Sequence, residues 1–118
     1  MEKNDLGKTS LGMEANVAAV LSYVLGLVTG IIFFLVEKEN KFVRFHAMQS
    51  IIIFGSLLVV SLANSLILRI ILPWQISSMI AGILGIIGLI LWIVLMIKAY
   101  QGDYFKLPIA GDIAEKNS

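Results

Sequence analysis

The hydrophobic residues of this chain fall into three long runs, without a helical stripe or a strand-like alternation. The runs are Val17–Val36, Ile51–Leu72 and Ile76–Ile97, of 20, 22 and 22 residues, and the only charged residue in them is Arg69. As α-helices they would be about 30–33 Å long, and the hydrocarbon core of a bilayer is about 30 Å thick. The pattern therefore predicts an all-α integral membrane bundle of three transmembrane helices.

Short polar segments separate the three runs. Residues 37–41 end the first run, and residues 73–75, a proline, a tryptophan and a glutamine, separate the second from the third. Proline ends helices because it lacks an N–H donor, and tryptophan favours the membrane–water interface. We expect a tight hairpin there and a single domain over residues 1–118, with polar tails at 1–14 and 113–118.

Composition indicates that lipid is the main solvent of the chain. Hydrophobic residues make up 58% and charged residues 14% of the 118 residues, and the mean hydropathy is +0.92; soluble domains are about 25% charged. A net charge of +1 argues against a nucleic-acid partner, because such domains carry a dense basic face. Without cysteine, disulfides and thiolate sites are excluded. The polar N-terminus lacks the pattern of a cleaved signal peptide, so we expect it to be retained.

The distribution of lysine and arginine predicts an orientation. If three helices cross, one side of the membrane carries Lys38, Lys41, Arg44, Lys98, Lys106 and Lys116, and the other carries Lys3, Lys8 and Arg69. Cytoplasmic segments are the richer in these residues. We therefore expect a multi-pass protein of the cell (inner) membrane, with the N-terminus outside and with the C-terminus and loop 37–46 in the cytoplasm.

The segment Lys38–Ser50 places polar chemistry at the start of the second run. Asn40 can cap a helix that begins at Lys41. A helix from Lys41 to Leu72 would be about 48 Å long, much longer than the membrane is thick. We therefore expect an interfacial N-terminal extension of the second helix, with a bend near Gly55.

One face of this extension has two interpretations. Phe42, Phe45, His46 and Gln49 fall at i, i+3, i+4 and i+7. The face is either a membrane-surface anchor, with cations on anionic lipid heads, or a polar site. In the second case Arg44, His46 and Gln49 face the bundle interior and bind a ligand, an ion or a partner. A lone histidine is a weak indication of metal, and we expect neither a metal nor a cofactor.

Two further sets of residues lie within the predicted spans. Ser61, Asn64 and Ser65 form a polar patch, which either hydrogen-bonds to a neighbouring helix or lines a path for a solute. Small residues predict close helix packing, within one chain or in a homo-oligomer. They are Gly26, Gly30, Gly82, Gly85 and Gly88.

Two segments of the sequence resemble a known family. "LSYVLGLVTGIIFFLVEKENKFVRFHAMQS" and "FKLPIAGDIAEK" are similar to the Tic20-like family of small bacterial and archaeal membrane proteins (the DUF4870 group). Its relatives include the chloroplast protein Tic20 and magnetosome proteins of the MamF type. The resemblance implies an integral helical membrane protein and marks motif positions without giving them a role. Those positions are Glu37, Lys38, Glu39, Asn40, Phe42, Arg44, Phe45, His46, Gln49, Ser50, Lys106, Leu107, Pro108, Gly111 and Asp112.

The expected function follows from these features. Both motifs fall on the cytoplasmic side, so we expect Asp112 to pair with Arg44 or His46 and to pin the tail there. No spacing favours catalysis, and we expect a non-enzymatic scaffold or accessory subunit that acts through helix–helix and cytoplasmic-surface contacts. Its partners would be the lipid bilayer and further copies or other membrane proteins. The alternative is an oligomeric, Tic20-like channel or transporter for an ion, a small solute or a peptide, lined by Ser61, Asn64 and Ser65.

Overall fold

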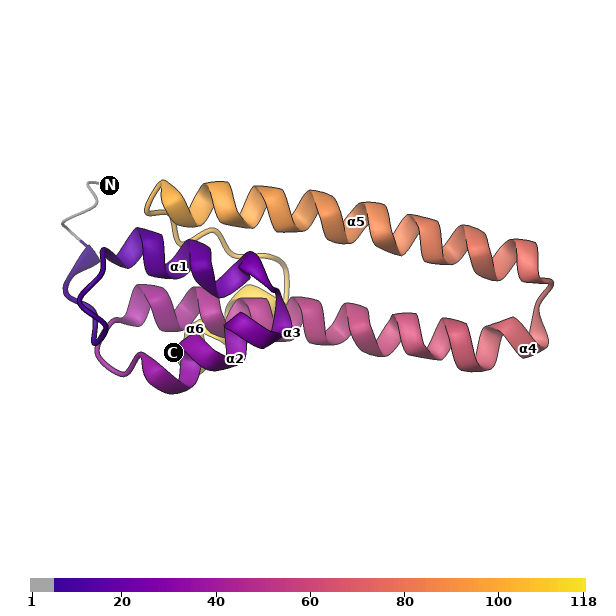
Figure 1. Cartoon of the computed structure of the whole chain (residues 1–118), viewed down its shortest axis with the longest axis horizontal. Helices are drawn as coiled ribbons and strands as arrows, with labels where there is room; N and C mark the ends of the chain where they lie inside the picture. The colour runs from indigo at the N-terminus through magenta and orange to yellow at the C-terminus, as the bar shows by residue number, and fades with distance from the viewer. Residues whose placement is uncertain (1–5) are drawn as a thin grey trace.

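The residues that the structure describes, 6–118 of a computed structural model, form helices and no strands. In chain order these are α1 (Ala15–Val24), α2 (Leu27–Val36), α3 (Lys41–Ala63), the π-helix η2 (Asn64–Leu68), α4 (Arg69–Ile71), α5 (Trp74–Tyr100) and α6 (Ala110–Asn117). The molecule measures 52 × 22 × 21 Å, because α3, η2 and α4 form one long rod antiparallel to α5 (Figure 1). The all-α prediction is confirmed.

Among residues 6–118, two helices are long and apolar enough to cross a membrane. They are the continuous rod Lys41–Ile71, of 31 residues, and Trp74–Tyr100, of 27 residues. The rod begins where the sequence predicts, because the Asn40 side chain accepts a hydrogen bond from the Val43 N–H at 3.1 Å and caps the helix. It continues through Gly55 as one helix, so the expected bend there is not seen. The residues of the predicted extension, including Phe42, Phe45 and His46, are buried within the protein.

The first hydrophobic run is not a third spanning helix. It forms α1 and α2, of 10 residues each, which turn back on each other and lie beside the start of α3 (Figure 1). Each is about 15 Å long, half the thickness of the hydrocarbon core. Gly26 reverses the chain with φ +60° and ψ −116°, a conformation that is strained for any residue with a Cβ. Three transmembrane helices are therefore not confirmed.

Thr29 closes the α1–α2 turn from within the hairpin. Its Oγ1 accepts from the Leu25 N–H at 3.1 Å and donates to the Ser22 carbonyl at 3.1 Å. The end of α1 and the start of α2 leave such main-chain groups without helical partners. One hydroxyl therefore supplies both a donor and an acceptor that the broken helix lacks.

Side chains from α3 and α5 complete the same turn. Ser50 Oγ donates to the Gly26 carbonyl at 2.9 Å, and Trp92 Nε1 donates to the Tyr23 carbonyl at 2.8 Å. Non-helical backbone is tolerated at membrane depth only where protein groups satisfy it. The turn is thus held by residues that lie far from it in sequence.

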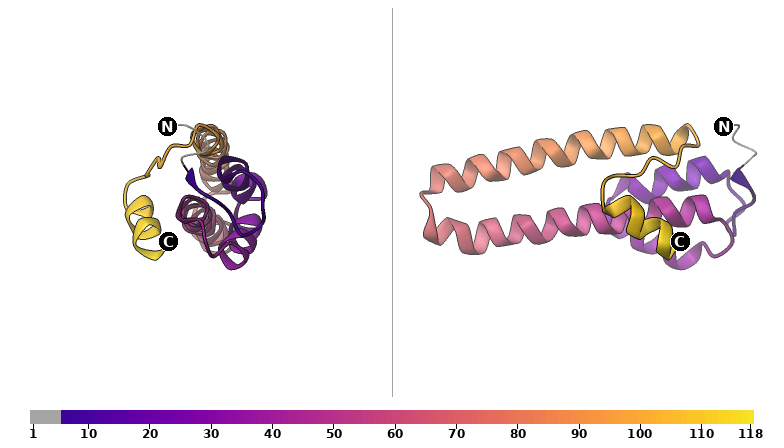
Figure 2. Two further views of the ribbon diagram at one scale, coloured as in Figure 1. Left: turned by 90° about the vertical axis from the view of Figure 1, so that its left-hand side faces the viewer. Right: turned by 180° about the vertical axis from the view of Figure 1, so that it is seen from behind.

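The N-terminal segment lies against the loop between α2 and α3. The Ser10 N–H donates to both carboxylate oxygens of Glu37, at 2.9 and 2.8 Å, and Asn40 Nδ2 donates to the Lys8 carbonyl at 3.0 Å. Because α1 and α2 turn back, this segment, the loop and the C-terminal tail gather at one end of the molecule (Figure 2). The predicted topology, with the N-terminus and loop 37–46 on opposite sides, is therefore wrong for the segment from Leu6 onward.

The core is confined to one half of the molecule. We name residues 6–50 and 91–118 the proximal half and residues 51–90 the distal half. Among the described residues, every buried apolar side chain belongs to the proximal half, where α1, α3 and α5 pack around Tyr23, Phe42 and Leu95. In the distal half only Asn64 and Ser77 are buried.

Candidate functional site

A buried chain of hydrogen bonds links α1, α3 and the C-terminal tail in the proximal half. It contains Tyr23 from α1 and His46 and Gln49 from α3, and all three side chains are fully buried. The Tyr23 hydroxyl oxygen lies 2.6 Å from His46 Nδ1 and 3.1 Å from Gln49 Nε2. His46 and Gln49 share a helix face because they are three residues apart. The structure turns this face inward, toward protein.

The partners of His46 determine its tautomer. Nε2 lies 2.9 Å from the Asp103 carbonyl oxygen, which can only accept, so Nε2 carries the proton. Nδ1 is then an acceptor: the Tyr23 hydroxyl donates to it, and the hydroxyl oxygen accepts from Gln49. The ring also packs edge to face on Phe42, with 4.6 Å between centroids. Both nitrogen atoms of the neutral His46 imidazole thus take part in the buried chain of hydrogen bonds.

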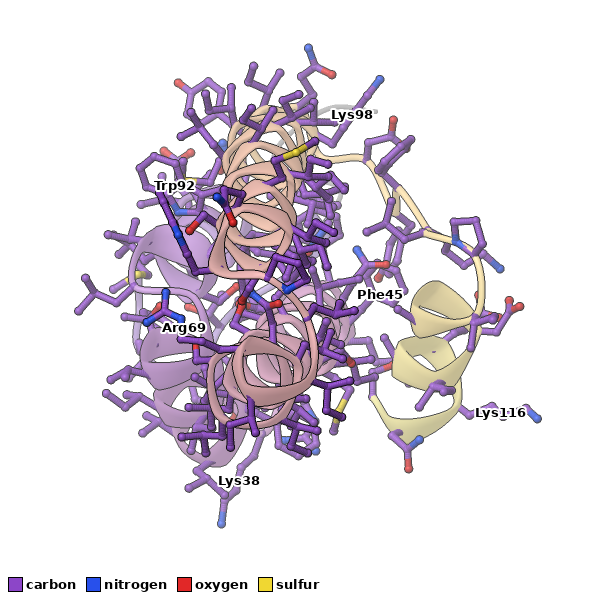
Figure 3. The ribbon with its side chains drawn as sticks, turned by 90° about the vertical axis from the view of Figure 1, so that its right-hand side faces the viewer. Lys38, Phe45, Arg69, Trp92, Lys98 and Lys116 are labelled. Atoms are coloured by element: carbon purple, nitrogen blue, oxygen red, sulfur yellow. The ribbon has the colours of Figure 1, made fainter. Side chains whose placement is uncertain are left out.

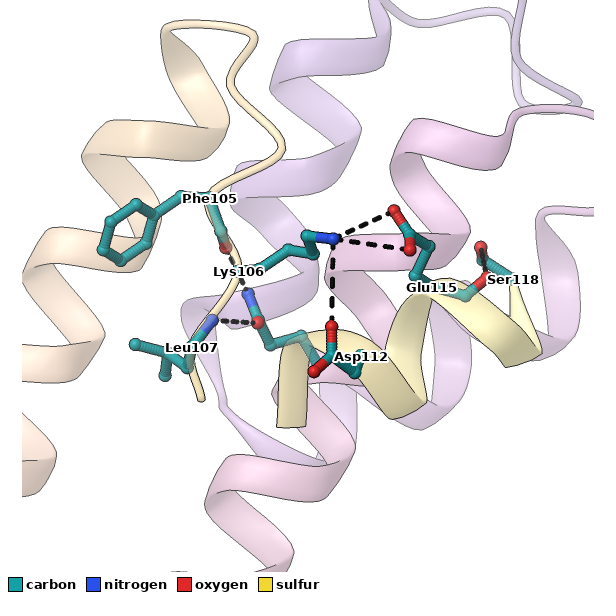
Figure 4. Close-up of polar contacts among 7 residues, drawn as sticks. Phe105, Lys106, Leu107, Asp112, Glu115 and Ser118 are labelled. Atoms are coloured by element: carbon teal, nitrogen blue, oxygen red, sulfur yellow. Dashed lines mark hydrogen bonds and ion pairs between the residues drawn. The ribbon is translucent and has the colours of Figure 1, made fainter. Parts of the chain in front are cut away.

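Gln49 binds the main chain of the tail much as a neighbouring strand would. Its Nε2 donates to the Phe105 carbonyl at 2.9 Å and its Oε1 accepts from the Leu107 N–H at 3.0 Å (Figure 4). Together with the bond from His46 to Asp103, two side chains hold three alternate residues of an extended segment. The path of the tail is therefore set through its backbone.

Arg44 joins the end of α2 to the tail. Its Nη1 donates to the carbonyls of Phe34 and Glu37, both at 2.8 Å, and its guanidinium lies 4.1 Å from the centre of the Phe34 ring. Its Nε donates to the main-chain oxygen of Ser118 at 3.2 Å. Carbonyls at the end of a helix have no further helical N–H to accept from. Arg44 therefore acts as a side-chain cap of α2.

The predicted pairing of Asp112 with Arg44 or His46 is wrong. Asp112 Oδ1 lies 3.8 Å from Lys106 Nζ, and a Glu115 carboxylate oxygen lies 3.3 Å from the same atom (Figure 4). The Asp112 and Glu115 side chains are 72% and 61% exposed, so these pairs contribute little. The charges of Asp112 and Glu115 are thus paired within the tail, and the tail reaches α3 through its main chain.

The Glu37 carboxylate is a second polar centre. It accepts from the N–H and hydroxyl of Ser10 and from the N–H groups of Glu39 and Asn40, at distances of 2.8 to 3.1 Å. Burial raises the pKa of this carboxyl, but the hydrogen bonds outweigh burial and hold its pKa below the ordinary value of 4.5. The ionised group fastens the N-terminal segment to the α2–α3 loop.

The polar patch predicted in the second run is not a single feature. Asn64 is buried; its Nδ2 donates to the Ser77 carbonyl at 3.0 Å, and Ser77 Oγ donates to Asn64 Oδ1 at 3.1 Å. Ser61 is half-buried and Ser65 is exposed. Asn64, the first residue of η2, thus joins the rod to α5 in the distal half, and its amide is used for interhelical bonding.

The five predicted packing glycines have different surroundings. Gly26 forms the α1–α2 turn, and Gly30 brings α2 so close to α3 that a Cβ there would lie 3.1 Å from it. Gly88 faces α3, where a leucine side chain lies 3.4 Å from the position of a Cβ. Gly82 and Gly85 have nothing within 4 Å. The first three therefore serve packing within the chain.

The architecture defines the class of protein: a small helical protein in which two helices are long and apolar enough to span a membrane. Comparison with known families then gives the particular group. The model of the magnetosome magnetite crystal formation protein family, MamF_MmsF, matches residues 8–114, and the chain belongs to this family.

Similar proteins are membrane proteins of archaea. UPF0132 membrane protein MJ1443 of Methanocaldococcus jannaschii is 50% identical over 113 residues, 96% of each chain. A UPF0132 membrane protein of Archaeoglobus fulgidus is 48% identical over 104 residues, 88% of this chain and 95% of the relative. UPF0132 membrane protein MJ1527 of Methanocaldococcus jannaschii is 47% identical over 107 residues, 91% of this chain and 72% of the relative. No solved structure matches the chain.

These matches overturn the resemblance found in the sequence analysis. The family model and the UPF0132 relatives cover nearly the whole chain, so the assignment to the Tic20-like family (DUF4870) is wrong. What holds is the broader statement that the chain belongs to a family of small membrane proteins. A channel or transporter inferred from the Tic20-like assignment loses that support.

Sequence reasoning missed Tyr23, Thr29, Ser77 and Trp92, each of which makes a buried or half-buried hydrogen bond. A single hydroxyl or indole in a hydrophobic run reads as part of a lipid-facing helix, so the signal is weak. Of these four residues, Ser77 alone could have been found from the sequence. It lies 13 residues after Asn64, and the predicted hairpin between them brings the two side by side.

Proposed function

We propose that the protein is a non-enzymatic membrane scaffold. The rod α3–α4 and α5 anchor it, and the proximal half forms a rigid platform at one membrane surface. One observation carries this proposal: the polar side chains of the proximal half bind one another and the main chain of the same molecule. His46, Gln49, Arg44 and Glu37 all fix segments of this chain in place. Because these polar groups are already bonded within the protein, we favour a scaffold that presents a surface to partners over an enzyme with a reactive side chain.

The charge distribution supports a cytoplasmic location for the platform. Of the eight described lysine and arginine residues, seven belong to the proximal half and Arg69 alone to the distal half; Lys3 lies outside the described residues. Lys38, Lys98 and Lys116 point outward in the view along the molecule (Figure 3). Cytoplasmic segments are enriched in such residues. We therefore place the N-terminal segment, loop and tail in the cytoplasm and the α4–α5 connection outside the cell membrane.

We also propose that the α1–α2 hairpin enters the cytoplasmic leaflet and returns without crossing. Leu25, Val28 and Leu35 on the hairpin are 66%, 56% and 64% exposed. Apolar surface of this size favours lipid over water. The arrangement in the membrane is then two spans and one re-entrant hairpin.

Self-association through α5 belongs to the same proposal. Gly82 and Gly85 leave open space on α5, and small residues let membrane helices approach closely. Gly88 faces α3 of the same chain, and the chain has no cysteine, so Gly85→Cys and Gly88→Cys are a matched pair. We expect disulfide-linked dimers in membranes from the first variant and not from the second. Equal yields would contradict this interface.

Two measurements test the arrangement and the function. Leu11→Cys and Asn117→Cys, both at exposed positions, should react with an impermeant reagent from the cytoplasmic side, and Trp74→Cys from the other side. Reaction of the first two from opposite sides would refute the two-span arrangement. Liposomes with purified protein should pass no more ion or solute than empty liposomes. Flux that Asn64→Leu abolishes would establish transport instead of scaffolding.

A further inference from the structure

We infer that the protein is a membrane wedge. It displaces more lipid from the leaflet on its proximal side than from the opposite leaflet, and it therefore favours a bilayer that curves so that the proximal leaflet is expanded. This inference rests on the two-span arrangement proposed above. It adds a physical activity, a preference for curved membrane, that anchoring and scaffolding do not require.

Two hydrogen bonds set how deep the α1–α2 hairpin reaches along α5. Near the start of α1, Asn16 Nδ2 donates to the Tyr100 carbonyl at 3.1 Å, and near its end the Tyr23 carbonyl accepts from Trp92 Nε1 at 2.8 Å. The uncharged run of α5 ends at Ile97, so the hairpin overlaps roughly its last six residues, about 9 Å. The hydrocarbon of one leaflet is about 15 Å thick, and the hairpin ends within it.

The number of helices differs between the two halves. In the proximal half α1, α2, α3, α5 and α6 lie around one another, whereas only the rod and α5 continue through the distal half (Figures 1 and 2). A helix with its side chains is about 10–12 Å wide, so the hairpin alone adds on the order of 200 Å² to the cross-section in one leaflet. The opposite leaflet meets no such addition.

The surface of the hairpin identifies acyl chains as its neighbours. No charged residue lies between Glu14 and Glu37, and outward positions such as Leu21, Ile32 and Leu35 are 36%, 49% and 64% exposed. The lysines of the proximal half lie just beyond, where headgroups begin. Amphipathic helices inserted at a similarly shallow depth bind membranes in a curvature-sensitive way, and the hairpin inserts apolar surface into one leaflet in the same manner.

Helix α6 adds to the same leaflet. Its buried face, Ala110 and Ala114, packs on the bundle, while Ile113 and the preceding Ile109 are 42% and 76% exposed. The exposed surface also carries Asp112, Glu115 and Lys116, and a short helix with apolar and charged side chains on one surface suits the membrane interface. The tail therefore widens the proximal end further.

A nanotube pulled outward from a giant vesicle tests the wedge in two directions at once. The full chain carrying Asn117→Cys has one cysteine and takes one fluorophore on the exposed end of the tail. In the tube the outer leaflet is expanded and the inner leaflet compressed. Copies with the tail outside should be enriched, with a tube-to-vesicle ratio above one. Copies with the tail inside, seen alone after an impermeant quencher is added outside, should be depleted, with a ratio below one.

Two matched triple variants show whether the hairpin is the cause. The hairpin variant is Leu25→Ala, Val28→Ala and Leu35→Ala, and the distal variant is Leu66→Ala, Val59→Ala and Ile86→Ala. All six side chains are 56% to 66% exposed, so neither variant disturbs the packed core. The hairpin variant should move both ratios toward one. The distal variant, which thins the narrow end, should leave them unchanged or move them further apart.

The contrary outcomes are distinct. Ratios of one in both orientations would overturn the wedge, and so would equal effects of the two triple variants. A spin label can be placed at Leu25→Cys. If it contacts a second copy of the protein and is shielded from oxygen dissolved in lipid, the wedge would also be overturned. If Leu11→Cys and Asn117→Cys are labelled from the same side but the protein is neither enriched in nor depleted from the tube, the wedge is wrong and the two-span arrangement stands. Labelling of Leu11→Cys and Asn117→Cys from opposite sides would remove the proposed arrangement first.

Discussion

The proximal and distal halves are stabilised in opposite ways. In the proximal half apolar side chains are buried among packed helices, with polar groups bonded inside them. In the distal half apolar side chains are exposed or half-buried, and the two buried residues, Asn64 and Ser77, are polar. Lipid gives apolar helix faces no hydrophobic reason to associate. The two helices of the distal half are therefore joined by hydrogen bonds between Asn64 and Ser77, and the proximal half by a network that holds chain ends and a turn.

The largest effect should come from breaking the proximal network with Gln49→Leu. The leucine leaves the Phe105 carbonyl and the Leu107 N–H without their partner and removes a donor to Tyr23. Each buried unsatisfied group costs about 1–3 kcal/mol. The two tail bonds are partly buried, so we expect the free energy of unfolding to fall by about 2–3 kcal/mol in all. A spin label at Asn117→Cys should become mobile as the tail detaches.

The distal half supplies the control for that experiment. Ser65 is exposed, so Ser65→Leu should change the free energy of unfolding by less than about 0.5 kcal/mol. If Gln49→Leu kept both its stability and an ordered tail, the two halves would not differ in their dependence on buried polar bonds.

The next effect concerns the same substitution at two glycines, Gly111 and Gly85. A Cβ at Gly111 would collide with Lys106 Cβ and lie 2.7 Å from Lys106 Cα, so α6 must move. Overpacking of this kind costs about 1–3 kcal/mol. At Gly85 nothing lies within 4 Å, and alanine is the better helix former by about 1 kcal/mol. Unfolding in detergent, with the protein monomeric, should show Gly111→Ala destabilised and Gly85→Ala unchanged or stabilised; the reverse order would contradict the contrast.

Much of the distal half could be predicted from the sequence, because its determinants are local. Two hydrophobic runs around Pro73, with Arg69 as their single charged residue, indicate an antiparallel helix pair, and Asn40 before Lys41 indicates where the rod begins. The first run was misread as one span because the hydrophobicity of 20 residues is the same for a span and for two half-length helices. What distinguishes them is Gly26 together with bonds from Ser50 and Trp92, which other helices supply.

The candidate site was predictable on one side only. Helical spacing brings His46 and Gln49 to one face, but their partners in the tail are main-chain atoms of residues 103–107. Recognition of the backbone leaves no pattern of side chains in the sequence. Asp112 was the visible charge in the tail, and it pairs locally with Lys106 instead. Whether these residues contact a partner protein stays a prediction.

A smaller effect is expected within the distal half, at Asn64 and Ser77. Hydrogen bonds between membrane helices average about 0.6 kcal/mol and rarely exceed about 2 kcal/mol. A double-mutant cycle of Asn64→Ala and Ser77→Ala should give a coupling energy of about 0.6 kcal/mol. Ser78 is exposed, so the cycle of Asn64→Ala with Ser78→Ala should be additive. Additivity in both cycles would show that the bond from the Ser77 hydroxyl to Asn64 does not stabilise the helix pair.

The smallest effect is a pH dependence that belongs to the proximal half alone. Burial opposes ionisation of Glu37, but hydrogen bonds from Ser10, Glu39 and Asn40 hold its folded-state pKa below the ordinary 4.5. The ionised carboxyl therefore stabilises the fold above about pH 4.5, and this contribution is lost as the pH falls through the lower folded-state pKa. The difference in free energy of unfolding between wild type and Glu37→Gln should be constant near neutral pH and shrink in acid. The exposed Glu39→Gln serves as the control. A difference that persists unchanged in acid would mean that the charge of Glu37 does not hold the N-terminal segment, and that packing alone does.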